Sequence, residues 1–193
     1  MKNLFLVVLL FGSVQLLQAD DILKNSDFTD GALNWHGDGR SPADLKPADA
    51  LDTSAPNYGD KGLIIVLKPR NWTKIVQEFK SDTATVHLNI SYQLAPNTVF
   101  STKEEDYKNV PNKIDFNGWL PFNGKVGSWM VMLSDFAKER IFYNSVESSA
   151  NPTAPQNFSC SYNSLIPEDE KTLCLAFPPG TGAVILLHVS LEK

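Results

Sequence analysis

Acidic residues and histidines are the side chains in this sequence that could carry out acid–base or metal chemistry. Two acidic runs occur at 104–106 and 168–170, and the three histidines are His36, His87 and His188. Sugar hydrolysis needs two carboxylates held at a fixed separation, and zinc sites need characteristic ligand spacings. Runs of like charge in loops are usually solvated, and the histidines have neither zinc-ligand spacing nor a matching Ser and Asp. We therefore expect a protein that is not an enzyme and has no catalytic residues.

Aromatic and polar side chains suggest a different chemistry, the binding of a sugar. An aromatic ring stacks on the apolar face of a pyranose, while amides and carboxylates hydrogen-bond its hydroxyls. The candidate residues carry either such a ring or such a polar group: Trp119, Phe116, Trp72, His87, Asn89, Gln93 and Gln77. The alternative is that the rings cover the edges of a core and that the polar groups are simply solvated.

The polar candidates His87, Asn89 and Gln93 belong to the segment 84–94, "ATVHLNISYQL". Every second residue of this segment is apolar, which is typical of a strand with one face on a core and the other face toward water or a ligand. The residues expected to face the core are Val86, Leu88, Ile90, Tyr92 and Leu94. Gln77 is expected on a neighbouring strand.

Short strands separated by turns dominate the rest of the chain, and no helical stripe of apolar residues occurs after residue 19. Further strands are predicted at 62–68, 73–79, 128–134, 140–145, 172–177 and 183–191. Two long loops are expected at 40–60 and 97–127, and the second contains Phe116 and Trp119. This spacing predicts an all-β antiparallel sandwich.

The stretch "NSDFTDGALNWHGDG", residues 25–39, could be a metal loop or the first strand and turn of the fold. An EF-hand loop counted from Asp27 needs oxygen ligands at its third and fifth positions and glycine at its sixth. Thr29, Gly31 and Ala32 stand there, so the metal loop is rejected. We expect Ile22 and Leu23 to enter a sheet, Phe28 to enter the core, and Trp35 to pack back after a turn at Asp30-Gly31.

The N-terminus has the layout of a secretory signal peptide. Lys2 precedes an apolar run at 4–17, and Ala19 offers a small residue for cleavage. The run is about 14 residues, shorter than the roughly 20 of a membrane span, although an uncleaved anchor stays an alternative. We therefore expect residues 1–19 to be removed and 20–193 to form one domain that is periplasmic, at the cell surface or extracellular, with no membrane span. The net charge of −5 argues against nucleic acid as a partner and against an anionic membrane surface.

Cys160 and Cys174 are the two cysteines of the chain. An exported protein meets oxidising conditions, so an even number of cysteines predicts a disulfide between them. The alternative is two separate buried thiols.

Four segments resemble exported carbohydrate-binding modules of family 4/9 type: "ILKNSDFTDGALNWHGDG", "WTKIVQEF", "VHLNISYQLAPN" and "GAVILLHVSLEK". The second and third resemble the paired central strands of those modules. The resemblance implies a galactose-binding-domain-like jelly roll and a carbohydrate partner. It also makes a structural calcium ion a candidate ligand. Such modules hold that ion with an acidic residue after the Phe and an Asp in the closing strand. Thr29, Leu187 and His188 stand at those places, so we expect no cofactor and no metal ligands.

Two functions fit this pattern. The first is a non-catalytic carbohydrate-binding module-like protein. The second is a structural or interaction protein of the cell surface or periplasm, with the same fold and no sugar site. An open groove beside Trp119 favours the first, and a groove filled by the loop at 97–127 favours the second. The oligomeric state does not follow from the sequence.

Overall fold

A computed structural model describes residues 20–37, 46–47, 62–108, 125–135, 140–147 and 153–193. The predicted signal peptide, nearly all of the loop at 40–60, and both Phe116 and Trp119 lie outside these residues. Within the described part of the chain, none of the helical structure has the length and apolar character that a membrane crossing requires.

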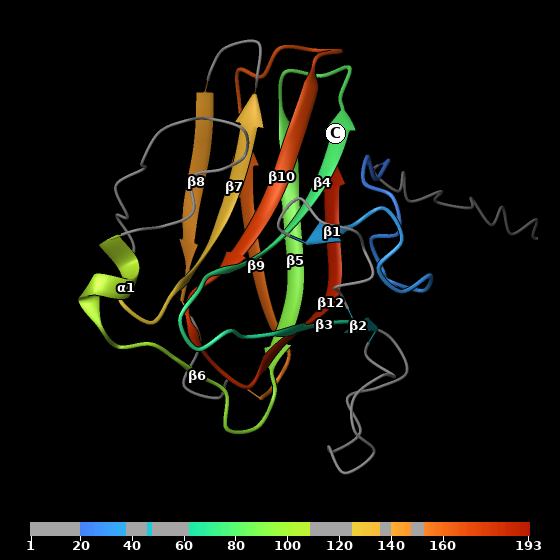
Figure 1. The fold of residues 1–193 in the computed structure, drawn as a ribbon. Helices are drawn as coiled ribbons and strands as arrows, with labels where there is room; N and C mark the ends of the chain where they lie inside the picture. The colour runs from blue at the N-terminus through green and yellow to red at the C-terminus, as the bar shows by residue number, and fades with distance from the viewer. Residues whose placement is uncertain (1–19, 38–45, 48–61, 109–124, 136–139, 148–152) are drawn as a thin grey trace, which may run out of the picture.

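Two five-stranded antiparallel sheets pack face to face (Figure 1). The first, here called the β4 sheet, has the order β1 (His36–Gly37), β4 (Thr73–Lys80), β10 (Glu170–Phe177), β7 (Trp129–Asp135) and β8 (Arg140–Val146). The second, called the β5 sheet, has the order β2 (Lys46–Pro47), β3 (Leu63–Val66), β12 (Ala183–Glu192), β5 (Val86–Leu94) and β9 (Gln156–Tyr162). A small ladder pairs β6 (Val99–Phe100) with β11 (Gly180–Thr181). The predicted antiparallel jelly-roll sandwich is confirmed.

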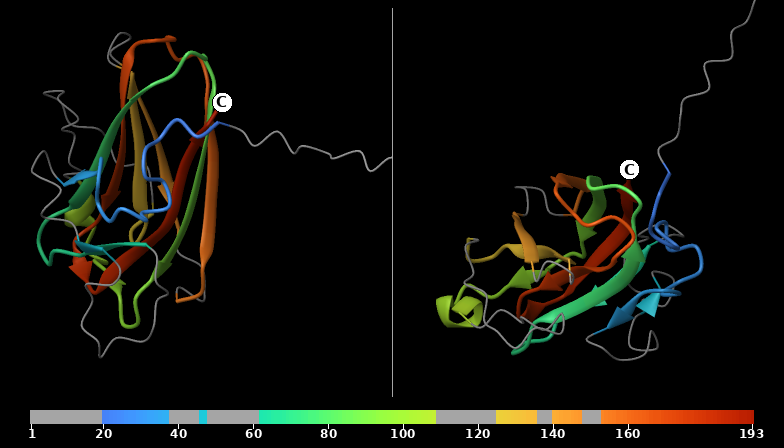
Figure 2. Two further views of the ribbon diagram at one scale, coloured as in Figure 1. Left: turned by 90° about the vertical axis from the view of Figure 1, so that its right-hand side faces the viewer. Right: turned by 90° about the horizontal axis from the view of Figure 1, so that it is seen from above.

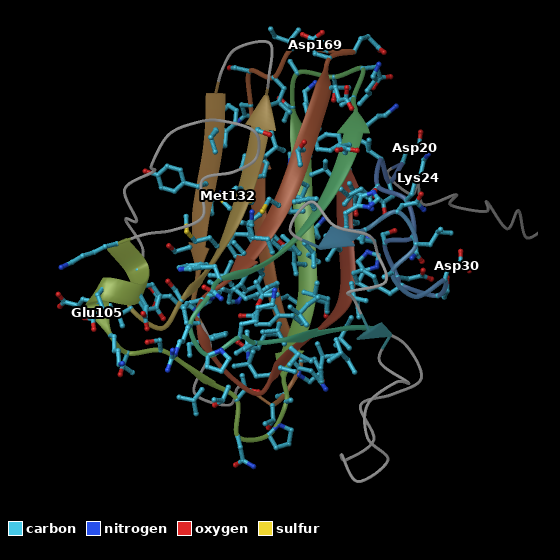
Figure 3. The ribbon with its side chains drawn as sticks, viewed as in Figure 1. Asp20, Lys24, Asp30, Glu105, Met132 and Asp169 are labelled. Carbon is cyan, nitrogen blue, oxygen red and sulfur yellow. The ribbon has the colours of Figure 1, made fainter. Side chains whose placement is uncertain are left out.

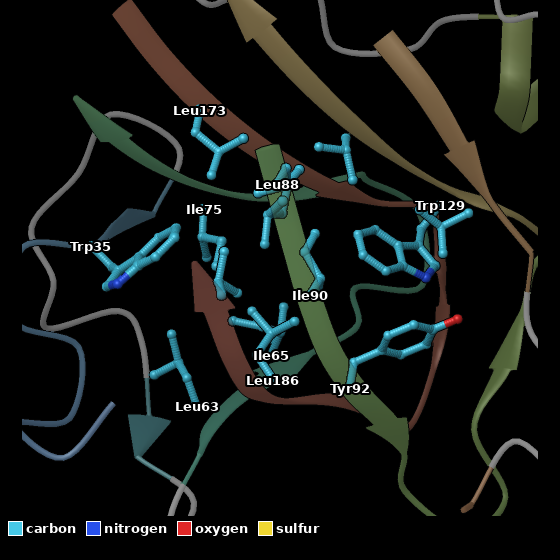
Figure 4. Packing of buried hydrophobic residues seen from close by; sticks show 14 of the residues in the cluster. Trp35, Leu63, Ile65, Ile75, Leu88, Ile90, Tyr92, Trp129, Leu173 and Leu186 are labelled. Atoms are coloured by element: carbon cyan, nitrogen blue, oxygen red, sulfur yellow. The ribbon is translucent and has the colours of Figure 1, made fainter. Parts of the chain in front are cut away.

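The core lies between the two sheets, and β5 supplies its central row. The five apolar residues predicted to face inward are all buried, namely Val86, Leu88, Ile90, Tyr92 and Leu94. Figure 4 shows Trp35 at one end of this core and the Tyr92–Trp129 pair at the other. Those two rings meet edge to face with centroids 5.1 Å apart, the geometry that aromatic quadrupoles favour. The predicted register of β5 is therefore correct.

The remaining predicted strands correspond to β3, β4, β7, β8, β10 and β12. Among the described elements longer than two residues, two were missed, β9 and the short helix α1 (Glu104–Lys108). The acidic run at 104–106, expected in a loop, forms the first turn of α1, where carboxylates interact favourably with the helix dipole. The expected pairing of β4 with β5 is wrong, because the two strands lie in different sheets.

Residues 20–35, here called the N-terminal strap, form a series of turns rather than the expected opening strand. A single antiparallel bridge joins Asp21 to Glu192, and the Ile22 amide donates to the Leu191 carbonyl at 2.8 Å. Phe28 and Trp35 nevertheless pack into the core as predicted, and Leu23, expected in a sheet, is buried beside them. Gly31 takes a φ of 63°, which a turn needs and glycine adopts at little cost. The stretch 25–37 is thus a structural element.

The N-terminal strap closes one side of the sandwich (Figure 2). It begins beside β12 in the β5 sheet and leads into β1, which pairs with β4 in the other sheet. The opposite side is closed by side chains of β8 and β9. Phe142 and Tyr162 have centroids 5.8 Å apart, and Asn144 donates to the Tyr162 hydroxyl at 3.4 Å.

The predicted disulfide is wrong, because no bond joins Cys160 to Cys174. Cys160 lies in β9 and packs against the core between the sheets. Cys174 lies in β10 of the other sheet, and its side chain belongs to a cluster on the outer face of that sheet. The two side chains are therefore separated by the β4 sheet, and an even cysteine count could not reveal this.

The two thiols give a direct test. Protein unfolded in denaturant without reductant should take up two alkyl groups, as intact mass would show. In the native protein Cys160 should react slowly, because burial raises the pKa of its thiol, outweighing hydrogen bonds with Tyr162 and Asn144 that lower it. An unfolded chain that takes up no alkyl group would contradict this arrangement.

Candidate functional site

The outer face of the β4 sheet carries Trp72 and a group of apolar residues around it. This group is called the Trp72 cluster and consists of Trp72, Tyr107, Met130, Met132, Cys174 and Ala176. The Trp72 indole N–H donates to the Asp106 carbonyl at 2.8 Å, and its ring meets Tyr107 edge to face at 5.8 Å. These contacts hold α1 against the sheet.

Tyr107 fixes the same region from the other side. Its hydroxyl donates to the Ser101 carbonyl at 2.6 Å and accepts from the Gly127 amide at 2.8 Å. Burial raises the pKa of this hydroxyl, partly offset by the hydrogen bond from Gly127. Trp72 is only 8% exposed, so the ring predicted as a stacking platform packs inside the protein. Trp72 therefore fits the alternative better, in which the aromatic ring covers the edge of a core.

The centre of this outer face is closed to solvent. Met130 and Met132 of β7 are almost completely buried, and Figure 3 labels Met132 on that strand. Val76, Ile141 and Tyr143 form a half-buried fringe around the cluster. Among the described residues, this face therefore presents no fully exposed aromatic ring to a ligand.

Gln77 was predicted to lie on a strand next to β5, and this placement is wrong. Gln77 lies in β4, in the other sheet, and is 3% exposed. Its amide nitrogen donates to the Lys24 carbonyl at 3.0 Å, and its amide oxygen accepts from the Lys24 N–H at 2.7 Å. The side chain pairs with the strap backbone as a neighbouring strand would, which satisfies two buried polar groups.

The outer face of the β5 sheet presents three rows of polar side chains across β9, β5 and β12. This surface is called the polar face, and the strand registers define its rows as Ser161–His87–Glu192, Ser159–Asn89–Ser190 and Asn157–Ser91–His188. Residues directly opposite one another on antiparallel strands lie about 4.5–5.5 Å apart, so members of a row are neighbours.

Hydrogen bonds fix several side chains of the polar face. His87 Nδ1 and Ser161 Oγ are 2.8 Å apart, and Ser159 Oγ donates to Asn89 Oδ1 at 2.8 Å. Ser190 Oγ donates to Glu192 Oε1 at 3.0 Å. Each bond restricts a rotamer while the amide, imidazole and hydroxyl groups keep further donor or acceptor capacity.

The polar face is open to solvent on β9 and more sheltered on β12. His87, Asn157, Ser159 and Ser161 are exposed, whereas Asn89, Ser91, His188 and Glu192 are half-buried and Ser190 is buried. Of the predicted site residues, the structure brings His87 and Asn89 together here. Gln93 lies further along β5, 9% exposed, opposite the buried Ile185. Of the three predicted residues on β5, His87 and Asn89 therefore lie on the polar face, and Gln93 is buried.

The contribution of β9 to this face was not predicted from the sequence. Asn157, Ser159 and Ser161 alternate with Phe158 and Cys160, whose side chains pack toward the core. This alternation in "QNFSCSY" is a strand signal. The segment was not recognised as a strand because its inward-facing residues give only a weak hydrophobic signal.

The row Ser161–His87–Glu192 contains the residue types of a hydrolytic triad, but its geometry differs. Glu192 accepts from Ser190, and the row lies on an open sheet face, whereas acyl transfer needs an oxyanion site shielded from water. Within the described parts of the chain, no group of three or more His, Cys, Asp and Glu residues is close enough to hold a metal ion. The groups that the polar face presents are hydrogen-bond donors and acceptors.

Comparisons with known proteins define the class of fold. No protein-family model and no curated protein matches the sequence. Among solved structures, TmCBM61 in complex with β-1,4-galactotriose is similar with a TM-score of 0.57 and 13% identity, over 91% of this chain and 99% of that chain. The CBM22-1 xylan-binding domain of Xyn10C from Paenibacillus barcinonensis has a TM-score of 0.52 and 11% identity, over 90% and 94%.

The same architecture also occurs inside an enzyme. In the arabinose-bound α-L-arabinofuranosidase MgGH51, the similar region is 26% of that chain and 89% of this one, with a TM-score of 0.57 and 12% identity. At such identities the likeness concerns the fold. The chain thus has the jelly-roll fold of carbohydrate-binding modules.

Proposed function

We propose that this protein is a non-catalytic, exported carbohydrate-binding module-like protein, and that it binds oligosaccharide or polysaccharide on the polar face. The observation that carries the proposal is the set of three polar rows on three adjacent strands of a fold that carbohydrate-binding modules share. In this proposal His87 and Asn89 are hydrogen-bonding residues, and Ser159 and Ser161 join them. Trp119 and Phe116, outside the described residues, are proposed to add stacking.

The polar face suits sugar hydroxyls for two physical reasons. Amide, hydroxyl and imidazole groups each offer a donor and an acceptor, as sugar hydroxyls do. Side chains already held by hydrogen bonds on strands lose little conformational entropy when a ligand binds. The three rows contain no Lys or Arg, so the proposed ligand is a neutral glycan rather than a sulfated one.

Affinity electrophoresis tests this proposal with neutral β-glucans, xylans and galactans beside sulfated algal glycans. Wild-type protein should be retarded by a neutral glycan. Asn89→Ala should weaken binding by about 0.5–1.5 kcal/mol, the net contribution of an ordinary hydrogen bond. Trp119→Ala should weaken it by roughly 1–3 kcal/mol, the scale of an anchor residue in other interfaces.

Glu78→Ala is the matched control, because Glu78 is exposed on β4, in the other sheet. It should bind as wild type does. If Asn89→Ala also binds as wild type does, the polar face is not the site. If no glycan in the panel retards the wild-type protein, sugar binding itself is contradicted.

A structural or interaction protein of the cell surface is the second candidate. The observation that favours it is the burial of Trp72 and Gln77, both predicted as ligand-binding residues. A wild-type protein that ignores the whole glycan panel supports this candidate.

A further inference from the structure

The two sides of the sandwich end in strands of very different length. On the side of the N-terminal strap, the edge strands β1 and β2 have two residues each. On the opposite side, the edge strands β8 and β9 have seven residues each. Among the described residues, no strand pairs with the outer edge of either one. An edge strand of this kind presents a row of backbone groups that can pair with another chain.

Edge strand β9 lacks the features that commonly prevent such pairing. Natural edges are blunted by short length, by charged side chains, or by proline and bulges. The sequence of β9, "QNFSCSY", contains no charged residue and no proline, and its register with β5 runs without a shift from Tyr162 to Gln156. The short strands β1 and β2 blunt the edges on the strap side, whereas β9 leaves its edge open to pairing.

We propose that β9 pairs antiparallel with β9 of a second copy of this chain, about a two-fold axis at Ser159. Ser159 is the middle residue of the seven, so this axis pairs the whole strand. Asn157 then lies opposite Ser161 of the second copy, and Phe158 lies opposite Cys160 of the second copy. No like charges meet, and an amide faces a hydroxyl on the polar face. The strand is therefore complementary to itself.

This arrangement joins two five-stranded sheets into one continuous sheet. The two-fold axis is perpendicular to the sheet, so both polar faces point to the same side. Edge strand β8 lies on the same side of the sandwich as β9, which brings the two β8 edges toward each other. Their contact adds area to a single ladder, which alone would be small for a stable dimer. If the proposed function holds, a repeating glycan meets two copies of the site at once, which raises avidity.

Sedimentation velocity over a concentration series tests the dimer. The average mass of wild-type protein should rise toward twice that of the monomer. Ser159→Lys should remain monomeric, because two lysines then face each other at the axis. Ser159→Glu should behave in the same way, and an equal mixture of the two variants should form a heterodimer. Glu78→Lys, a charge change on the other sheet, should associate as wild type does.

Cross-linking tests the register. Directly opposed residues of an antiparallel pair have Cα atoms about 4.5–5.5 Å apart, within the range that a disulfide spans. Ser159→Cys should therefore form a covalent dimer under mild oxidation, and Ser161→Cys, which faces Asn157 of the second copy, should not. A wild-type protein that stays monomeric at every concentration, or a Ser159→Lys variant that associates like wild type, overturns the proposal. Glycan retardation of the wild-type protein, measured at concentrations where it is monomeric, reports on sugar binding separately.

Discussion

Trp35→Ala is expected to lower the free energy of unfolding by about 3–5 kcal/mol, the usual cost of removing a buried tryptophan. Trp35 is completely buried, its ring centroid lies 5.6 Å from that of Phe28, and its indole N–H donates to the Asn25 carbonyl at 3.3 Å. The substitution removes packing between the N-terminal strap and both sheets. Urea unfolding curves of the two proteins measure the effect.

Leu33→Ala is the control for this experiment. Leu33 lies in the same strap, two residues before Trp35, but is 56% exposed. Its replacement should change the free energy of unfolding by no more than about 0.5 kcal/mol. If Trp35→Ala is as mild as Leu33→Ala, the strap does not close the core as described.

Leu88→Ala should cost about 2–5 kcal/mol, the range for a buried leucine. Leu88 has no exposed surface and occupies the middle of β5, the strand between β12 and β9. The wide range reflects how far the surrounding side chains can relax into the cavity. The loss should appear in the midpoint of denaturant unfolding, with little change in its slope.

His87→Ala provides the comparison on the opposite face of the same strand. His87 is exposed and makes one hydrogen bond, to Ser161, so its loss should stay within about 0.5 kcal/mol. Equal effects at positions 87 and 88 would mean that the register of β5 is wrong.

Local patterns were sufficient to predict most of the strands. Alternation along β5 placed Leu88 and His87 on opposite faces, and burial confirms both assignments. The reason is that one sheet face is covered by the core, so polarity along the strand must follow the period of two residues. Turns such as the one at Gly31 could be predicted equally well, because few residues adopt positive φ easily.

Contacts between distant segments could not be predicted from the sequence in the same way. Gln77 alternates like an ordinary strand residue, yet its amide meets Lys24, 53 residues away in the chain. The assignment of β4 and β5 to different sheets depends on the order of strands, which local periodicity does not contain. The same limit produced the disulfide error, because a cysteine count says nothing about which sheet each thiol occupies.

The bridge between Asp21 and Glu192 places both ends of the described chain side by side. Because that pairing is antiparallel, a force that pulls on the two ends loads these hydrogen bonds one after another instead of all together. Peeling would begin at Asp21 and Glu192 and would proceed through the Ile22–Leu191 bond toward Val189, whose amide donates to Ser26. Under tension applied through its ends, this domain should therefore open at low force, with the N-terminal strap separating from β12 first.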